Sequence, residues 1–470
     1  MAHLPVAADY IVVGGGLTGC LIASRLRQSD KKPEVVLMEA GSDPSDNPAA
    51  AGFLSGLSLL GGEFDYVYQS DPVTSTANRV HSLNSGKALG GGSILNYGGW
   101  LRADAADYDE WAEVRYLYYD SWSYEGLKPW FRKSECFHNP EADADDHGFD
   151  GLMHVTSISA AESGARKYLL REPVKEAWAE LRVAPNLERK NSAIAGLTEM
   201  CENSREGMRQ PSNMAYPLHG VKVLTNTVVH RVSFSGTTAT GVELADGRKI
   251  YGPKGGIGPS ATLAEHGIPI VHESTQVGRN LHDHFAIYLA FRLRDPSLGQ
   301  PLPAEIITKH EPDVEKQKRN LWKVITSMLH PAYPEFLLTP NYLSTPLDRD
   351  TLVHAARQTL NFMLATGPMK AIVDSESPPS GEDLDSLAPL TADVTDEGIE
   401  ERIRCTRMQH HHSGGTAAMG KVVDGEGKVL GVRRLRVADA SILPIPLSGH
   451  PQATLYAMGE QLSSFIIKDA

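Results

Sequence analysis

The sequence has no long apolar run, few cysteines and no excess of positive charge. No apolar stretch reaches the roughly 20 residues needed to span a bilayer, so we expect no membrane-spanning helix. The 470 residues include only four cysteines, and none forms a C-x-x-C pair, which argues against a disulfide framework. Acidic residues outnumber basic ones by 58 to 45, which disfavours binding to nucleic acid or to an anionic membrane surface.

The residues before Asp9 also lack a basic stretch followed by an apolar stretch. Such a pattern would indicate a secretion signal, so we expect a cytoplasmic protein with reduced cysteines. The length predicts two or more domains, each large enough to bury a core.

What the sequence does contain is a glycine-rich motif at Asp9–Gly19, DYIVVGGGLTG. Apolar residues at Tyr10–Val13 predict a short buried strand. Gly14, Gly16 and Gly19 complete the pattern G-x-G-x-x-G. The first glycine permits a tight turn, the second a close approach of a pyrophosphate and the third close packing of the next helix. The predicted phosphate-binding residues are Gly14, Gly16, Leu17, Thr18 and Gly19.

The elements after this loop favour dinucleotide binding. Cys20–Arg27 is predicted as a helix whose N-terminal amides face the phosphates, and Glu34–Met38 as a second strand. Glu39 follows that strand at about the spacing expected of a carboxylate that binds a ribose hydroxyl, and it would repel the 2′-phosphate of NADP. The alternative is a glycine-rich turn in an ordinary α/β protein.

A second glycine-rich stretch, Gly86–Asp109, reads GKALGGGSILNYGGWLRADAADYD. Its three successive glycines predict a backbone that comes very close to a flat or charged group. The stretch resembles the flavin-binding signature of the glucose–methanol–choline (GMC) oxidoreductases, which makes Gly91, Ser93 and Asn96 cofactor-binding residues. Some members bind the flavin covalently through a histidine next to the asparagine. Leu95 stands there in this chain, so the resemblance implies non-covalent FAD.

The C-terminal block Gln409–Ile467 resembles the C-terminal signature of the same family over nearly its whole length. His412 takes the place of the histidine before a Gly-Thr pair, and His450 takes the place of the family's second active-site residue. The same resemblance implies that the remaining cofactor-binding residues are Val229, Asp439, Ala440, Gln452 and Thr454.

Two histidines at these positions suit the oxidation of an alcohol. A hydride moves from carbon to flavin N5 while a base removes the hydroxyl proton, and an imidazole of pKa about 6.5 can accept that proton. We predict that His450 accepts the proton and that His412 is its partner at the substrate oxygen. On a strand, His410 and His412 would share a face and His411 would point away. A surface histidine run or a metal-binding patch is the alternative. We predict no metal, because the sequence places no further ligand.

The resemblance extends from Asp9 to Ile467 and implies an α/β fold, with a Rossmann-like FAD-binding domain and a mixed-sheet α+β substrate-binding domain. Residues 1–285 would form the FAD-binding domain with inserted substrate-domain segments, and residues 286–408 the substrate-binding domain. Residues 409–470 would return to the FAD domain with the active-site histidines. The implied function is choline dehydrogenase-like oxidation of a small-molecule alcohol. The alternatives are a non-redox cyclase, dehydratase or lyase, and a degenerate member with impaired FAD binding. The alcohol, the electron acceptor and the oligomeric state remain open.

The chain departs from the family after Ile250, where a strand, a turn and a helix are expected before Gly256–Ile268. A similar shortening lies around His330–Pro340. Because loss of a strand from a buried parallel sheet exposes backbone groups, we expect weak cofactor retention. Val277–His284, VGRNLHDH, matches a family motif with a structural role, and Val221–Val232 is predicted as one strand.

Overall fold

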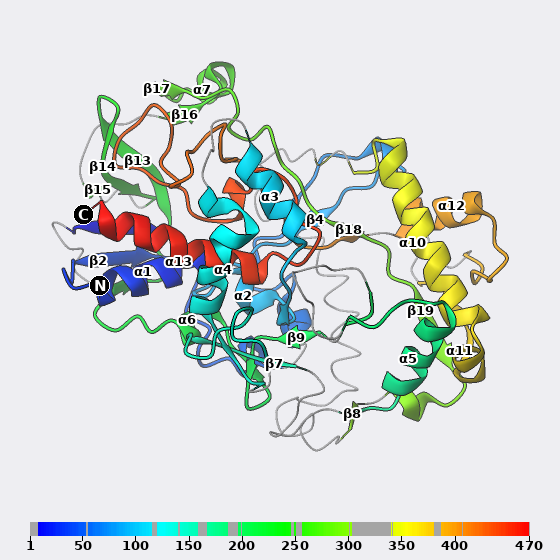
Figure 1. Ribbon diagram of the computed structural model, residues 1–470. Helices are drawn as coiled ribbons and strands as arrows, with labels where there is room; N and C mark the ends of the chain where they lie inside the picture. The colour runs from blue at the N-terminus through cyan, green and yellow to red at the C-terminus, as the bar shows by residue number, and fades with distance from the viewer. Residues whose placement is uncertain are drawn as a thin grey trace.

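The computed structural model contains a three-stranded parallel sheet that includes the first two strands of the chain (Figure 1). The strand order is β1 (Tyr10–Val13), β2 (Val35–Met38) and β12 (Lys222–Leu224), and helix α1 (Leu17–Gln28) connects β1 to β2. The residues that the structure describes are 8–52, 55–114, 120–139, 142–157, 167–186, 196–198, 200–245, 249–250, 256–299, 301–302, 340, 342–379, 387–406 and 408–469.

The β1–α1–β2 unit has the predicted element types in the predicted order. β1 has the predicted bounds, and α1 begins at Leu17, earlier than the expected Cys20. All four residues of β2 are buried, as expected of a strand with a parallel neighbour on each side. The glycine motif lies in this strand–helix–strand unit, at the connection between β1 and α1.

The prediction of a single strand over Val221–Val232 is wrong. The parallel strand β12 ends at Leu224, and the next strand, β13 (Val229–Ser235), belongs to another sheet. Asn226, between them, has φ 51°, in the left-handed region that asparagine tolerates better than most residues, and it turns the chain out of the parallel sheet. The second sheet is antiparallel, with β13 followed by β14 (Thr238–Leu244) and β15 (Lys249–Ile250).

The final helix, α13 (Gln452–Lys468), packs against both α1 and α4 (Tyr124–Ser134), and Figure 1 shows it in red beside the blue α1. Most of its first three turns are buried, which explains their small and apolar residues. The largest hydrophobic core forms around this packing, with Leu21, Tyr456 and Met458 fully buried in it. The helix therefore fixes the end of the chain to the glycine motif.

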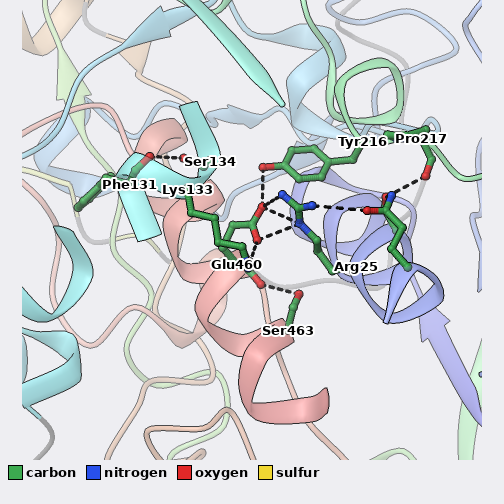
Figure 2. A network of polar contacts seen from close by, with 11 residues as sticks. Arg25, Phe131, Lys133, Ser134, Tyr216, Pro217, Glu460 and Ser463 are labelled. Carbon is green, nitrogen blue, oxygen red and sulfur yellow. Dashed lines mark hydrogen bonds and ion pairs between the residues drawn. The ribbon is translucent and has the colours of Figure 1, made fainter. Parts of the chain in front are cut away.

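A buried polar network joins the same three helices (Figure 2). The Glu460 carboxylate of α13 is fully buried and accepts a hydrogen bond of 2.9 Å from Nε of Arg25 on α1. It also accepts one of 3.1 Å from the Tyr216 hydroxyl, and it pairs with Nζ of Lys133 on α4 at 3.0 Å. A carboxylate removed from water is tolerated here because cations and a hydroxyl surround it.

A second, mixed sheet has the order β5 (Gly99–Trp100), β9 (Cys201–Glu202), β7 (Met153–Ser157) and β6 (Glu135–Phe137). The β6–β7 pair is parallel and the other pairs are antiparallel. The coexistence of a parallel and a mixed sheet agrees with the predicted fold class.

A separate group of helices lies on the other side of the molecule, at the right of Figure 1. The long helix α10 (Pro346–Ala365) packs against α12 (Asp396–Thr406) and α11 (Gly367–Ile372), and α11 packs against α5 (Arg171–Glu180). Thr345 caps α10, and its hydroxyl accepts from the Asp348 amide. These helices have small hydrophobic cores of their own.

The shortened stretches after Ile250 and near His330 fall on residues 251–255 and 303–339, outside the described residues. Within the described part of the chain, no helix is both long and apolar enough to cross a bilayer. The remaining elements are β3 (Tyr68–Gln69), β4 (Ser82–Leu83), β8 (Lys167–Tyr168), β10 (Ser204–Arg205), β11 (Met208–Arg209), β16 (Gly256–Gly258), β17 (Ile270–Glu273), β18 (Phe285–Ala286), β19 (Ala290–Leu293), β20 (Pro301–Leu302), β21 (Val373–Ser377), β22 (Met408–Gln409), α2 (Gly92–Leu95), α3 (Ala105–Glu113), α6 (Ser212–Ala215) and α7 (Ser260–Glu265).

Candidate active site

One cavity of about 2870 Å³ is lined by residues from both ends of the chain. It exceeds the roughly 300–1,000 Å³ of an ordinary small-molecule pocket, so it has room for a dinucleotide and a substrate together. The predicted site residues on its wall are Gly14, Gly16, Leu17, Thr18, Gly19, Glu39, Gly91, Asn96, Val229, His412, Asp439, Ala440, His450 and Gln452.

Two predicted cofactor-binding residues, Ser93 and Thr454, do not line this cavity. Both are fully buried. The Ser93 hydroxyl donates to the Gly90 carbonyl at 2.6 Å and accepts from the Ser212 amide at 2.9 Å. The Thr454 hydroxyl is 2.7 Å from that of Tyr108. Their side chains therefore hold the glycine-rich loop and the start of α13 in place from behind the cavity wall.

The first glycine motif has the backbone geometry of a phosphate-binding turn. Gly14 has φ 92°, and a Cβ on Gly19 would lie 2.0 Å from the Gly14 carbonyl oxygen, so both positions require glycine. A Cβ on Gly16 would meet nothing within 4 Å, which leaves that residue open on the cavity side. The N-terminus of α1 has no side-chain cap, and its free amides can bind an anion.

The second glycine-rich stretch packs directly on the first. Gly91 has φ 53°, and a Cβ there would lie 2.6 Å from Cα of Gly16. The Gly90 amide donates to the Gly15 carbonyl at 2.7 Å. The two loops thus form one continuous cradle, in which any side chain at Gly91 would clash with the phosphate-binding turn.

The Glu39 carboxylate lies on the cavity wall with both oxygens engaged by backbone. Oε2 accepts from the Gly15 amide at 2.7 Å, and Oε1 accepts from the Gly41 amide at 2.8 Å. Burial raises the pKa of this carboxyl, and the backbone hydrogen bonds oppose that rise. Each oxygen keeps a second lone pair, so a ribose hydroxyl can still donate to it.

Asn96 and Gln452 connect the glycine-rich loop to the start of α13. The Asn96 amide donates to Oε1 of Gln452 at 2.5 Å, and the Gln452 amide donates to the Gly99 carbonyl at 3.0 Å. Arg209 donates to Oδ1 of Asn96 at 3.0 Å. Both predicted residues therefore help to shape the wall through bonds within the protein.

The two predicted catalytic histidines meet on this wall. Nδ1 of His450 lies 3.1 Å from Nε2 of His412, and Nδ1 of His412 lies 2.5 Å from Nδ1 of His284. Nε2 of His284 lies 2.5 Å from the Leu447 carbonyl oxygen. Three imidazoles thus form a chain that starts at a backbone carbonyl and ends at His450.

The carbonyl determines which nitrogen of each neutral imidazole carries the proton. A carbonyl oxygen only accepts, so Nε2 of His284 donates and its Nδ1 accepts. His412 therefore donates through Nδ1 and accepts through Nε2, and His450 donates through Nδ1. Among the described residues, Nε2 of His450 has no hydrogen-bond partner, so it presents a lone pair that can take a proton.

Burial keeps the terminal pair neutral. It is the main cause that lowers the pKa of His450 to about 4, and the neighbouring histidines lower it further. The pKa of His412 is lowered even more, again chiefly by burial and then by the surrounding imidazoles. Both rings are therefore unprotonated bases at neutral pH.

The backbone around His412 differs from the strand considered in the sequence analysis. Strand β22 ends at Gln409, and His411 has φ 60° in the left-handed region. His410 and His412 still come together, with ring centroids 4.8 Å apart, and His411 turns to the Gln409 amide at 3.2 Å. A turn rather than strand alternation brings His410 and His412 together, and His411 lines the same cavity as they do.

His284 and Asp283 contact His412 but were not among the predicted site residues. Both lie in the motif that we interpreted as structural, directly before β18, which pairs with β22. Asp283 accepts from the His412 amide at 2.8 Å and from the Ser413 hydroxyl at 2.9 Å. The sequence HDH, an acid between two histidines, indicated a polar function. Only the pairing of β18 with β22 shows that His284 and Asp283 face His412.

The chain is similar to known proteins over nearly its whole length. Residues 8–286 and 327–459 each match a family profile described as GMC oxidoreductase. The GMC-type oxidoreductase acuG of Aspergillus aculeatus is 30% identical over 551 aligned positions, covering 98% of this chain and 99% of that protein. An oxygen-dependent choline dehydrogenase of Paraburkholderia phymatum is 26% identical over 539 positions, covering 97% and 92%. Both alignments exceed 470 residues, so each relative has stretches without a counterpart in this chain.

Solved structures show the same fold. Formate oxidase of Aspergillus oryzae RIB40 superimposes with a TM-score of 0.81 at 22% identity, covering 98% of each chain. An FAD-dependent oxidoreductase from Chaetomium thermophilum has a TM-score of 0.78 at 21% identity, covering 98% of this chain and 99% of that one. The overall fold is therefore shared with these proteins.

Proposed function

This chain belongs to the GMC oxidoreductase family of FAD flavoenzymes, and on that premise we propose that it oxidises an alcohol with His450 as the proton acceptor. One observation carries the proposal: a single cavity is lined both by the dinucleotide-type loop and by His450, the last residue of the histidine chain. A redox cofactor and a base would thus share one space.

The residues present fit FAD. The open Gly16, the uncapped start of α1 and the Gly91 contact with that turn leave space for a pyrophosphate, and Glu39 would hold a ribose hydroxyl. FAD supplies the hydride acceptor when bound. All other steps fall to the chain's own side chains.

The proposed reaction begins with an alcohol placed at His450. Nε2 of His450 accepts the hydroxyl proton as the hydride leaves the carbon, and the substrate becomes an aldehyde or ketone. The carbonyl of Leu447 and the ring of His284 hold His412 in the tautomer that keeps His450 ready to accept. Asp283 fixes the His412 backbone, so the base starts in position.

The experiment that tests this function is an anaerobic spectrum of the FAD-loaded protein before and after addition of primary and secondary alcohols. Oxidation of the correct alcohol should bleach the flavin, with one carbonyl product formed per flavin. Turnover of a substrate without bleaching would instead support the non-redox cyclase, dehydratase or lyase alternative.

A second candidate, a family member with impaired FAD binding, is favoured by one feature of the sheet. Within the described residues, β1 pairs only with β2, and Val13 at its end is 52% exposed. The cavity that would hold the cofactor extends along Tyr10–Val13 to the segment Leu435–Ser441. An unpaired strand edge at β1 would weaken the binding of the nucleotide half of FAD.

We expect the chain to lose FAD during purification without added cofactor, to well below one flavin per protein. Insertion of a strand–turn–helix segment between Lys254 and Gly255 should raise the flavin-to-protein ratio measured by absorbance. An unmodified protein that keeps a full complement of FAD would show that the open edge is tolerated.

We expect the flavin to be released by acid or heat. The linkage position holds Leu95, a buried residue packed in a hydrophobic cluster, and an alkyl side chain cannot bond to the isoalloxazine ring. After acid precipitation, the FAD should appear in the supernatant and be measurable by fluorescence. Flavin that stays with the precipitated polypeptide would contradict this prediction.

The rate of flavin reduction should fall on the acid side only near pH 4. Because the pKa of His450 is lowered to about 4 from 6.5, the base stays neutral until the pH falls through that lower value. The measurement is kcat/KM for reduction against pH, with circular dichroism at each pH to show that the protein is folded. Substitution of His410 by alanine should move the acid limb upward, since the His410 charge helps to lower this pKa.

A further inference from the structure

Three metal-ligating side chains gather on the mixed sheet, away from the cavity. They are Cys136 of β6, His138 just after it, and His154 of β7. None of them lines the cavity described above. In the sequence, His154 is separated from the other two by the loop between the strands, so the tertiary fold alone brings them together.

The strand register accounts for the cluster. β6 and β7 are parallel, and Cys136 pairs directly with His154. Side chains alternate between the two faces of a strand, so Cys136 and His138 share a face. Glu135 and Met153, the neighbours before each, are buried in the opposite direction, whereas His138 is exposed. The three ligands therefore face outward on one surface.

The distances suit a shared ion. One ligand atom from each residue lies within 4.8 Å of the others, and Nε2 of His138 is 2.6 Å from Nδ1 of His154. Zinc bonds are about 2.3 Å to sulfur and about 2.0–2.1 Å to imidazole nitrogen, so ligand atoms around one ion lie about 3–4 Å apart. The Cys136 thiol donates to the Phe149 carbonyl at 3.0 Å, so an ion would replace this hydrogen bond and separate the two imidazole nitrogens.

We propose that Cys136, His138 and His154 form a binding site for a borderline-soft divalent cation, with zinc as the best match and water as the fourth ligand. One thiolate and two imidazoles are donors that zinc prefers, whereas magnesium and calcium prefer oxygen. Zinc binds cysteine as the thiolate and histidine as the neutral imidazole, so binding would release the Cys136 proton.

The site would join β6 to β7 next to a buried polar centre. Glu135, which precedes Cys136, accepts from Arg102 at 2.7 Å and from the Trp100 indole at 3.1 Å, and it contacts His147 at 3.0 Å. A cation that clamps the two strands would hold this centre in place from the outer face. The expected role is structural, since the ligands lie off the cavity wall.

The test uses the FAD-loaded full chain and Co²⁺ as a spectroscopic probe for zinc. Tetrahedral Co²⁺ absorbs in the red, where oxidised flavin does not, so the titration can be read directly. We expect one equivalent of Co²⁺ to bind with these bands and to be displaced by Zn²⁺. Cys136→Ser and His154→Ala should each weaken binding by at least about tenfold, as loss of a supporting group at metal sites already does.

Two controls separate this site from others. Cys405→Ser removes a partly buried thiol elsewhere and should leave Co²⁺ binding unchanged. His410, His412 and His450 form a second possible cluster, so His410→Ala should also leave it unchanged. Binding that survives Cys136→Ser, or that is lost in His410→Ala, would overturn the proposal. His138→Ala, at an exposed position, gives the same test if Cys136→Ser does not fold.

Discussion

Replacement of His450 by alanine is expected to slow flavin reduction by about 10²–10⁴-fold, which is the usual contribution of a positioned general base. The substitution removes the lone pair at the end of the histidine chain, while the glycine loops that would bind FAD are untouched. The measurement is anaerobic stopped-flow reduction with saturating alcohol, together with the flavin-to-protein ratio. Normal reduction in His450→Ala, with a loss in His410→Ala, would contradict the assignment.

His412→Ala should cost a similar factor, because the chain then loses the acceptor that orients His450. The double variant should cost less than the product of the two single effects, since the imidazoles act as one unit. His410→Ala and His411→Ala are the matched controls, and their effects on the reduction rate should be much smaller. The loss of flavin reduction rate in His284→Ala should lie between these limits. This substitution leaves His450 in place but no longer fixes which nitrogen of His412 carries the proton.

Replacement of Glu460 by alanine is expected to lower the free energy of unfolding by about 3–5 kcal/mol, the range found when one partner of a buried ion pair is removed. The loss leaves the Arg25 guanidinium and the Tyr216 hydroxyl without their shared acceptor between α1 and α13 (Figure 2). The measurement is urea unfolding at a fixed FAD concentration, because bound cofactor adds to the apparent stability.

Two further variants test whether burial is the cause. Glu172→Ala removes an exposed carboxylate that pairs with Lys175 and should change the free energy of unfolding far less than Glu460→Ala does. The double variant Arg25→Leu/Glu460→Leu should be more stable than Glu460→Ala, since it also removes the guanidinium that Glu460→Ala leaves unpaired. The Tyr216 hydroxyl and Lys133 lose their partner in both variants, so they do not contribute to the difference. Equal losses in Glu172→Ala and Glu460→Ala would show that the buried pair has no special role.

The prediction of the strand–turn–helix–strand unit around the glycine motif is confirmed because its signals are local. Fewer than about thirty residues specify the turn at Gly14, the close contact at Gly19 and the strand on each side of one helix. The prediction of one strand over Val221–Val232 was wrong for an equally local reason. β-branched residues run through this stretch, but Asn226 turns the chain between two sheets. Apolar composition could not show which sheet each half would join.

The sequence by itself determined the chemistry available to this protein: a glycine cradle without side chains, a carboxylate after the second strand, and histidines near the C-terminus. Only the tertiary structure decided which of these residues face the cavity. Ser93 and Thr454 lie behind its wall, and His284 lies next to His412 because β18 pairs with β22. The parallel register of β6 and β7 likewise brings Cys136 to His154. Such contacts depend on how distant strands align, and spacing along the chain carries no record of that alignment.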